Sequence, residues 1–320
     1  MQKPDVLKNK VVLKEQSFLH EIEKGLLAES ASISPKFLYD PLGSHLFTAI
    51  TLLPEYYPTI TEKNILDQYK SEIAQTVGRV ETLIDLGAGN CLKAESLFNF
   101  LKPSNYVAID FSEEYLQVAL ENIRSKYPHI HMQCLGMDFS HKLILPDTIR
   151  NNDRVFFYPG SSIGNFLTSE AQTLLAQIKE QAGDGGLLIG IDLMKDDLIL
   201  KAAYDDDLKV TAAFNLNILR SVNSIIGSNF NVSQFRHEVK VNHSQNRVEL
   251  YLEALEDLSV SWPGNRRFFK KGELIHTENS HKYTINSIKL LLEDAGFKST
   301  KIWKDSKDYF ALIYAKTKTS

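Results

Sequence analysis

The sequence has little cysteine and no long apolar run. Its two cysteines, Cys91 and Cys134, lie far apart and form no metal-binding spacing, so we expect reduced thiols in a cytoplasmic protein. No stretch approaches the roughly 18 consecutive apolar residues that a membrane helix needs. Residues 1–16 also lack the apolar core of a signal peptide. These absences argue against a disulfide framework and predict no membrane partner.

Positive charge is neither in excess nor clustered. The net charge is -4, and the 36 lysines and arginines are scattered along the chain. A nucleic-acid partner requires a basic surface, so we expect none. The nine histidines form no metal motif. His129 and His131 would share a strand face, but carboxylates and cysteines are absent nearby, so we expect a structural pair and no metal.

A glycine turn follows a short apolar strand at residues 81–89. Gly87 and Gly89 carry no side chain and tolerate positive φ, so the backbone there can approach a ligand closely. Residues 91–98 then show the apolar spacing of a helix. A strand, a glycine turn and a helix in this order open a doubly wound nucleotide-binding sheet.

The turn departs from the dinucleotide pattern Gly-x-Gly-x-x-Gly. Leu92 stands where the third glycine would be, and Asp85 would be unfavourable beside a pyrophosphate but tolerable beside a cation. Two further carboxylates, Asp110 and Asp138, follow the next two predicted strands. Each aspartate alone could be a turn residue or a helix cap. The three together resemble the cofactor loops of class I S-adenosylmethionine (SAM) methyltransferases.

Strand and helix patterns alternate from about residue 81 to 195, and a helix at 285–295 precedes two closing strands. This order predicts the α/β fold of the class I SAM methyltransferases, a Rossmann-like sheet whose final strand is antiparallel. A long insert separates the fifth strand from the last helix, and within it residues 247–254 alternate as an antiparallel strand does. An insert of this length is not a bare loop.

We therefore predict two domains. A SAM-binding methyltransferase domain would comprise residues 61–195 and 284–320. A second, inserted α+β substrate-binding domain would comprise residues 1–60 and 196–283. A cleft between two domains is a usual place for a small substrate.

Several long motifs outside the glycine turn resemble one family, the ergothioneine-pathway L-histidine Nα-methyltransferases. They are FLYDPLGS at 37–44, LPEYYPT at 53–59, GSSIGN at 160–165, AYDD at 203–206, VTAAFN at 210–215 and TENS at 277–280. The resemblance runs from about residue 35 to the C-terminus. It implies three successive methyl transfers from SAM to L-histidine, giving Nα,Nα,Nα-trimethylhistidine (hercynine) in ergothioneine biosynthesis.

The resemblance also implies the site. The cofactor-binding residues would be Gly87, Gly89, Lys93, Asp110, Asp138 and Phe139, with Tyr39 closing over SAM. The substrate-binding residues would be Phe47, Tyr56, Gly160, Ser162, Asn165, Tyr204, Leu250, Glu278 and Ser280. Within this set Asn165 and Tyr204 would hold the histidine carboxylate and act with Tyr39 as catalytic residues, while Tyr56, Glu278 and Ser280 would bind the imidazole.

The residue types fit an imidazole ligand. A neutral imidazole offers one donor and one acceptor; Glu278 can accept, and Ser280 can donate or accept. Alternation puts both on one face if the segment is extended. Without the resemblance, the simpler interpretation is an exposed polar loop. Leu250 stands where the family often has methionine, a swap that conserves size and apolarity, so we expect altered packing and no new chemistry.

Other functions remain open at this point. They are SAM-dependent N-methylation of another amino acid or imidazole amine, a non-catalytic SAM-binding scaffold, and a nicotinamide oxidoreductase, which Leu92 disfavours. We expect L-histidine as the small-molecule substrate, and a monomer.

Overall fold

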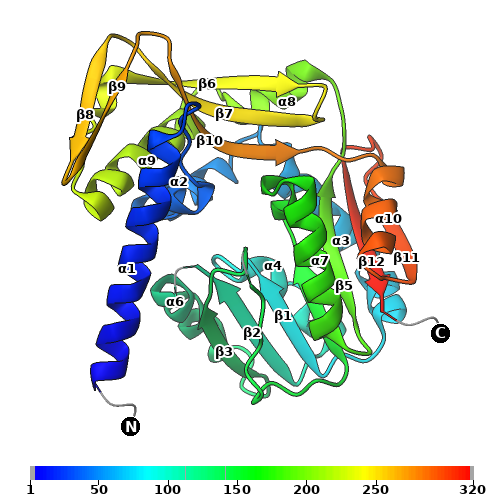
Figure 1. The fold of residues 1–320 in the computed structure, drawn as a ribbon. Helices are drawn as coiled ribbons and strands as arrows, with labels where there is room; N and C mark the ends of the chain where they lie inside the picture. Colours follow the sequence, from blue (N-terminus) through cyan, green and yellow to red (C-terminus); the bar gives the residue numbers. More distant parts are fainter. Residues whose placement is uncertain (1–3, 112, 141, 318–320) are drawn as a thin grey trace. The chain divides into compact units, whose positions relative to one another are not determined.

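The computed structural model describes residues 4–111, 113–140 and 142–317, which form two compact units (Figure 1). Of these residues, 56–199, 242–247 and 279–317 make up the larger unit, and 4–55, 200–241 and 248–278 make up the smaller unit. The short segments 56–60, 196–199, 242–247 and 279–283, expected in the substrate-binding domain, belong to the larger unit. Tyr57 and Lys282 illustrate the reason, since both hydrogen bond to Asp192 of the large sheet.

The larger unit is built on a seven-stranded sheet with the order β11-β12-β5-β4-β1-β2-β3. Its strands are β1 (Thr82–Leu86), β2 (Asn105–Asp110), β3 (His131–Gly136), β4 (Arg154–Tyr158), β5 (Gly186–Asp192), β11 (Ser299–Lys304) and β12 (Phe310–Lys316). The first five are parallel, and β12 runs antiparallel to both β5 and β11. This topology confirms the predicted fold class.

Both faces of the sheet are buried. Successive residues of a strand point to opposite faces, so Leu83 of β1 lies in one core cluster and Ile84 in the other. The first cluster is packed by α3 (Tyr57–Val77), α4 (Leu92–Glu95), α5 (Phe98–Leu101) and α6 (Glu113–Arg124). The second is packed by α7 (Thr168–Ala182) and α10 (Ile285–Asp294). The central strands read as continuous apolar runs because neither face meets water.

Two local predictions differ from the structure. The single helix expected at 91–98 is divided into α4 and α5, because the Ser96 hydroxyl donates to the Lys93 carbonyl (2.6 Å) and competes with the helical pattern. His129 lies in the turn before β3, not on the strand with His131, and its ring packs against Tyr127. The expected histidine pair on one strand face is therefore wrong.

The smaller unit combines helices with short antiparallel strands. Its helices are α1 (Pro4–Leu27), η1 (Pro35–Leu38), α2 (Pro41–Ile50), α9 (Val210–Ile226) and η3 (Val232–Gln234), and α8 (Asp197–Tyr204) leads into it. Its strands are β6 (Phe235–Asn242), β7 (Arg247–Ala254) and β10 (Leu274–His281) in the order β10-β7-β6, with a β8–β9 hairpin (Leu258–Trp262, Asn265–Phe269). None of the helices in the described ranges combines the length and apolarity of a bilayer crossing.

Candidate active site

The glycine turn leaves open space beside its backbone. Gly87 and Gly89 both have positive φ, 67° and 52°. The amide of Gly87 donates to the carbonyl of Ile109 (2.9 Å), which ties the turn to β2. A Cβ built on either glycine would meet no atom within 4 Å. The sequence thus places glycine where positive φ requires it, and the turn has room for a ligand against its backbone.

Two carboxylates lie at the ends of the neighbouring strands. Asp110 is the last residue of β2, at the carboxyl edge of the sheet, and its side chain accepts a hydrogen bond from the Gly89 amide (3.0 Å), which stabilises the glycine turn. Asp110 pairs in register with Gly136, the last residue of β3. Asp138, two residues later, accepts from the Ser140 amide (3.1 Å), and the neighbouring Phe139 packs edge-on against Tyr158 at 6.0 Å. These loops meet at one edge, as the sequence predicted.

Asp85 is buried inside β1. Its side chain is 1% exposed, one oxygen accepts from the Tyr106 hydroxyl (2.8 Å), and the other has no partner among the described residues. Burial raises the pKa of Asp85 to about 7, although the hydrogen bond from Tyr106 acts to lower this pKa. Asp85 is therefore not the loop carboxylate that the sequence suggested, because the strand continues past it to Leu86.

Lys93 is held by a buried glutamate from α3. Its ammonium lies 2.6 Å from Glu62 Oε2, and Glu62 is fully buried. The other Glu62 oxygen accepts from the Gly160 amide (2.8 Å), and Gly160 has φ 75°. One carboxylate thus fixes both a predicted cofactor residue and a predicted substrate residue, although the three residues come from distant parts of the chain.

The loop after β4 is fixed at both of its ends. Ser161 adopts a left-handed conformation (φ 57°), and its hydroxyl accepts from the Asp192 amide (2.9 Å). The Gly164 carbonyl accepts from the His281 ring (2.9 Å), and a Cβ on Gly164 would lie 2.8 Å from the His281 carbonyl. Between these anchors, Ser162 and Asn165 begin and end the short helix η2 and are half-buried.

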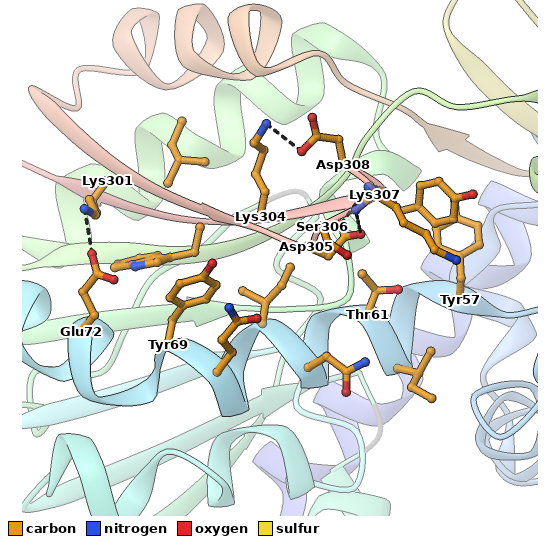
Figure 2. A pocket seen from close by; sticks show the side chains of 17 residues that line it. Tyr57, Thr61, Tyr69, Glu72, Lys301, Lys304, Asp305, Ser306, Lys307 and Asp308 are labelled. Carbon is orange, nitrogen blue, oxygen red and sulfur yellow. Dashed lines mark hydrogen bonds and ion pairs between the residues drawn. The ribbon is translucent and has the colours of Figure 1, made fainter.

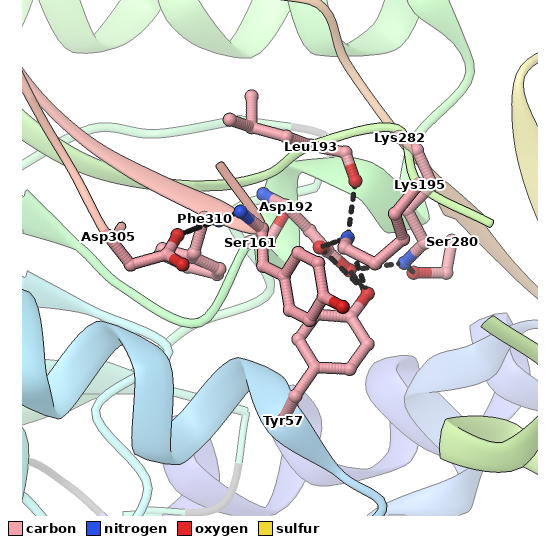
Figure 3. A network of polar contacts seen from close by, with 10 residues as sticks. Tyr57, Ser161, Asp192, Leu193, Lys195, Ser280, Lys282, Asp305 and Phe310 are labelled. Carbon is pink, nitrogen blue, oxygen red and sulfur yellow. Dashed lines mark hydrogen bonds and ion pairs between the residues drawn. The ribbon is translucent and has the colours of Figure 1, made fainter. Parts of the chain in front are cut away.

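A charged cluster surrounds Asp192 at the end of β5 (Figure 3). Its carboxylate accepts from Lys282 (2.7 Å), Lys195 (2.5 Å) and the Tyr57 hydroxyl (2.8 Å). All of these side chains are buried. Lys282 also donates to the hydroxyl of Ser280 (2.7 Å), a predicted imidazole-binding residue. The half-buried Tyr56 immediately precedes Tyr57 at the start of α3.

Burial and charge shift the pKa values of Asp192 and Lys195 in opposite directions. Burial alone would raise the pKa of Asp192, but the charges of Lys282 and Lys195 outweigh it and hold that pKa below its ordinary value. Burial lowers the pKa of Lys195 to about 8, with the attraction of Asp192 opposing it. Asp192 therefore stays ionised and can anchor both lysines.

In the smaller unit, Tyr39 belongs to an aromatic cluster. Its ring lies edge-on to Phe47 and to Phe214, each at 5.5 Å between centroids. Asp40, next to Tyr39, caps α2 by accepting from the Gly43 amide (2.7 Å). Helix α2 thus begins at Pro41, two residues after Tyr39, and Phe47 lies within it.

Tyr204, the last residue of α8, is held through its backbone. The Asn215 amide donates to His237 Nδ1 (2.9 Å), so the proton of a neutral His237 is on Nε2, which donates to the Tyr204 carbonyl (2.8 Å). Burial lowers the pKa of His237, in keeping with this neutral form. The hydrogen-bond network assigns this tautomer.

Leu250 and Glu278 lie on neighbouring strands of the small sheet. Leu250 on β7 is 1% exposed, and its carbonyl accepts from the Thr277 hydroxyl of β10 (3.0 Å). Glu278 on β10 is 8% exposed, and Ser280 follows on the same face of that strand. The segment 277–280 is therefore a buried strand, and the alternative of an exposed polar loop is wrong.

A pocket of about 900 Å³ lies elsewhere, between α3 and the β11–β12 hairpin (Figure 2). Its walls carry the ion pairs Lys301–Glu72 (2.8 Å) and Lys304–Asp308 (2.7 Å). None of the predicted site residues lines it. It lacks both the glycine turn and the strand-end carboxylates, so we do not assign the cofactor to it.

The residues that hold the predicted site residues in place were not predicted from the sequence. Asp192 carried a signal, since it is a carboxylate at the end of a predicted buried strand. Glu62, Lys195 and Lys282 carried none, because nothing in their local sequence distinguishes them from surface charges. Within the described residues, no group of three or more His, Cys, Asp or Glu could hold a metal ion.

Similarity to known proteins covers almost the whole chain. Residues 18–317 match the family described as "Histidine-specific methyltransferase, SAM-dependent". The histidine N-alpha-methyltransferase of Mycolicibacterium smegmatis is 34% identical over 309 residues, with 94% of this chain and 95% of that protein covered. The protein of the same name from Mycobacterium tuberculosis is 33% identical, with 92% and 93% covered. The ergothioneine biosynthesis protein 1 of Neurospora crassa is 31% identical, with 88% of this chain and 33% of that protein covered.

Proposed function

Because the chain belongs to the SAM-dependent family of histidine-specific methyltransferases, we propose that it methylates the α-amino nitrogen of L-histidine. Three successive transfers from SAM give Nα,Nα,Nα-trimethylhistidine. The observation that carries this proposal is the family match over residues 18–317, which includes every predicted site residue. The alternative of a nicotinamide oxidoreductase is set aside on the same ground.

The chain's residues fit the cofactor at the glycine turn. The space beside Gly87 and Gly89 admits the close approach of a ligand. We infer that Asp110, 21 positions after Gly89 and hydrogen bonded to its amide, would bind the ribose hydroxyls, as the strand-end carboxylate of such folds does. Asp138 and Phe139 on the next loop would bind the adenine, and Lys93, held by Glu62, would bind the amino-acid tail.

The substrate roles are proposed from the family resemblance. Asn165 and Tyr204 donate to the histidine carboxylate, which orients the substrate without a full ion pair. Tyr56, Glu278 and Ser280 bind the imidazole. Tyr39 and Phe47 supply aromatic faces that can accommodate positive charge, and Gly160, Ser162 and Leu250 shape the site.

When bound, SAM supplies a methyl group that its sulfonium already activates. The residues therefore need only align the amine and exclude water. The amine must be neutral to attack, whereas a free α-ammonium has a pKa of roughly 8 or above. A site that is poor in water and holds another cation lowers that pKa.

We further propose that the enzyme acts as a monomer in the cytoplasm and supplies ergothioneine biosynthesis. The pathway is proposed from the names of its relatives. The cytoplasmic location agrees with its two free cysteines, of which Cys91 is buried.

The test is to incubate the purified protein with SAM and each proteinogenic amino acid and to detect methylated products by mass spectrometry. We expect mono-, di- and trimethylated histidine. Efficient methylation of another amino acid, with none of histidine, would contradict the substrate assignment. Binding of SAM and histidine without turnover would indicate a non-catalytic scaffold.

The variant Glu278→Ala tests the imidazole site. It should lower kcat/KM for histidine about 10- to 100-fold, the loss of one hydrogen bond to a charged group, while SAM binding is retained. Glu293→Ala, at an exposed position of α10, is the matched control and should change neither value.

A further inference from the structure

Glu62 is a charged residue buried where α3 packs on the large sheet. Its carboxylate contacts segments of three neighbouring strands: Lys93 after β1, Gly160 after β4 and Gly190 within β5. A Cβ on Gly190 would lie 2.0 Å from Glu62 Oε1, so the glycine leaves the space that the carboxylate occupies. All four residues belong to the larger unit. The fold therefore holds this carboxylate in one place.

Lys93 is the charged partner of Glu62. Its Nζ lies 2.6 Å from Glu62 Oε2, and its side chain is 34% exposed, whereas that of Glu62 is 0% exposed. An ammonium group has three hydrogen-bond donors and no acceptor. Among the described residues the Lys93 ammonium bonds to Glu62 alone, so two of its donors remain for a ligand on the exposed side.

The loop after β4 holds the same carboxylate. The Gly160 amide donates to Glu62 Oε1 (2.8 Å) and Oε2 (3.1 Å). A hydrogen bond from a neutral amide to a carboxylate is strong and fixes its orientation. A Cβ on Gly160 would lie 3.2 Å from Lys93 Nζ, so this loop and the ammonium are adjacent. Glu62 thereby sets the position of the ammonium relative to the loop.

We infer that Glu62 is a positioning residue that preorganises the Lys93 ammonium for the carboxylate of the amino-acid tail of SAM. This inference rests on the proposed function, in which Lys93 binds that tail. A free lysine side chain samples many rotamers, and a ligand would have to immobilise it. Because Glu62 has already done so, the ligand binds more tightly. The charge of Glu62 acts in the opposite direction by repelling the ligand carboxylate, so the sign of the effect distinguishes the two roles.

Two ligands that differ only in the tail carboxylate provide the test. S-adenosylhomocysteine has this carboxylate, whereas S-adenosyl-3-thiopropylamine keeps the tail amine and lacks it. We expect the wild-type protein to bind the first at least about 10-fold more tightly, as measured by calorimetry. Glu62→Gln should raise the Kd for S-adenosylhomocysteine about 3- to 10-fold and change the Kd for the amine analogue by less than about twofold. Glutamine keeps an acceptor for the Gly160 amide, so this variant removes the ion pair and retains the loop contact.

Three further variants complete the test. Gly190→Ala displaces the same carboxylate from β5 and should give the same tail-selective loss, so it tests the inference even if Glu62→Gln fails to fold. Lys93→Met should weaken binding of S-adenosylhomocysteine at least as much, and adding Glu62→Gln to it should weaken binding no further, because both changes remove one shared interaction. Glu72→Gln is the matched control and should bind both ligands as the wild type does. It makes the same substitution on the same helix, in the ion pair with Lys301 (Figure 2).

Equal weakening of both ligands by Glu62→Gln would show a merely structural role and overturn the inference. Unchanged or tighter binding of S-adenosylhomocysteine would overturn it as well, since Glu62 would then not assist Lys93 or would compete with the ligand for it. A Lys93→Met protein with wild-type affinity would refute the tail-binding role of Lys93, and the inference with it. Failure of the wild-type protein to bind S-adenosylhomocysteine would instead refute the proposed function.

Discussion

The free energy of unfolding of an Asp85→Asn variant, relative to the wild type at the same pH, should be higher at pH 8 than at pH 5. Asp85 is fully buried in β1, and its pKa rises from an ordinary 3.8 to about 7, mainly by desolvation. Between these values the unfolded chain has lost this proton while the folded chain keeps it. The wild type therefore loses stability as pH rises from about 4 to 7. Asparagine does not titrate and removes this loss.

The size of the effect follows from the two pKa values. At about 1.4 kcal/mol for each pKa unit, the full loss is about 4 kcal/mol, of which about 2.5 kcal/mol falls between pH 5 and pH 8. The asparagine amide also adds a buried donor, which costs about 1–3 kcal/mol if unpaired. That cost is the same at both pH values, so it cancels in the difference. The Tyr106 hydroxyl can still donate to the amide oxygen, since it donates to the carboxylate now.

Urea unfolding at pH 5 and pH 8 measures the difference. Trp303 belongs to the larger unit and Trp262 to the smaller, so a Trp262→Phe background makes tryptophan fluorescence report on the larger unit. Asp147→Asn, at an exposed position, is the matched control and should change stability by under about 0.5 kcal/mol at either pH. A stability change for Asp85→Asn that is equal at the two pH values would refute the reasoning, because it would mean that Asp85 is ionised in the folded chain throughout.

Three further predictions concern buried positions. Gly190→Ala should raise the Kd for SAM, measured by calorimetry, because the new Cβ would lie 2.0 Å from Glu62 Oε1 and displace the carboxylate. Glu62→Gln should raise this Kd too. An unchanged Kd in both variants would contradict the role of Glu62. Cys91 is buried, and desolvation raises the pKa of its thiol to about 12. N-ethylmaleimide at pH 7.5 should therefore label this thiol only after unfolding, as measured by mass spectrometry. Rapid labelling of the native protein would disprove this prediction. Gly164→Ala should lower the free energy of unfolding by about 1–3 kcal/mol, because the new Cβ meets the rigid backbone of His281. It should also raise the KM for histidine more than the Kd for SAM. Equal changes in this KM and this Kd would argue against a substrate-side effect.

The cofactor edge could be predicted from local patterns. Gly87 and Gly89 follow an apolar strand at the start of an alternating β/α series, and Asp110 and Asp138 follow the next two strands. In a parallel sheet the carboxyl ends of neighbouring strands share one edge, so these residues had to come together once the strands were identified. Asp85 illustrates the limit, since nothing local showed that its strand would bury it.

The substrate residues were predicted from a resemblance. Glu278 and Ser280 looked like an exposed loop by composition, and the structure makes them part of a buried strand. This segment is buried because it pairs with β7. Pairing between strands that are distant in the sequence cannot be predicted from the residues of either strand alone.

The fold class, the glycine turn and the acidic strand ends can be predicted from local sequence, because each depends on residues close together in the chain. Which charged residues support them depends on contacts that form only in the folded protein. Glu62 reaches Lys93 and Gly160, and Asp192 reaches Lys282, across intervals of 31 to 98 residues. A buried charge is recognisable only from its partners and from the exclusion of water, and both arise when the chain is folded.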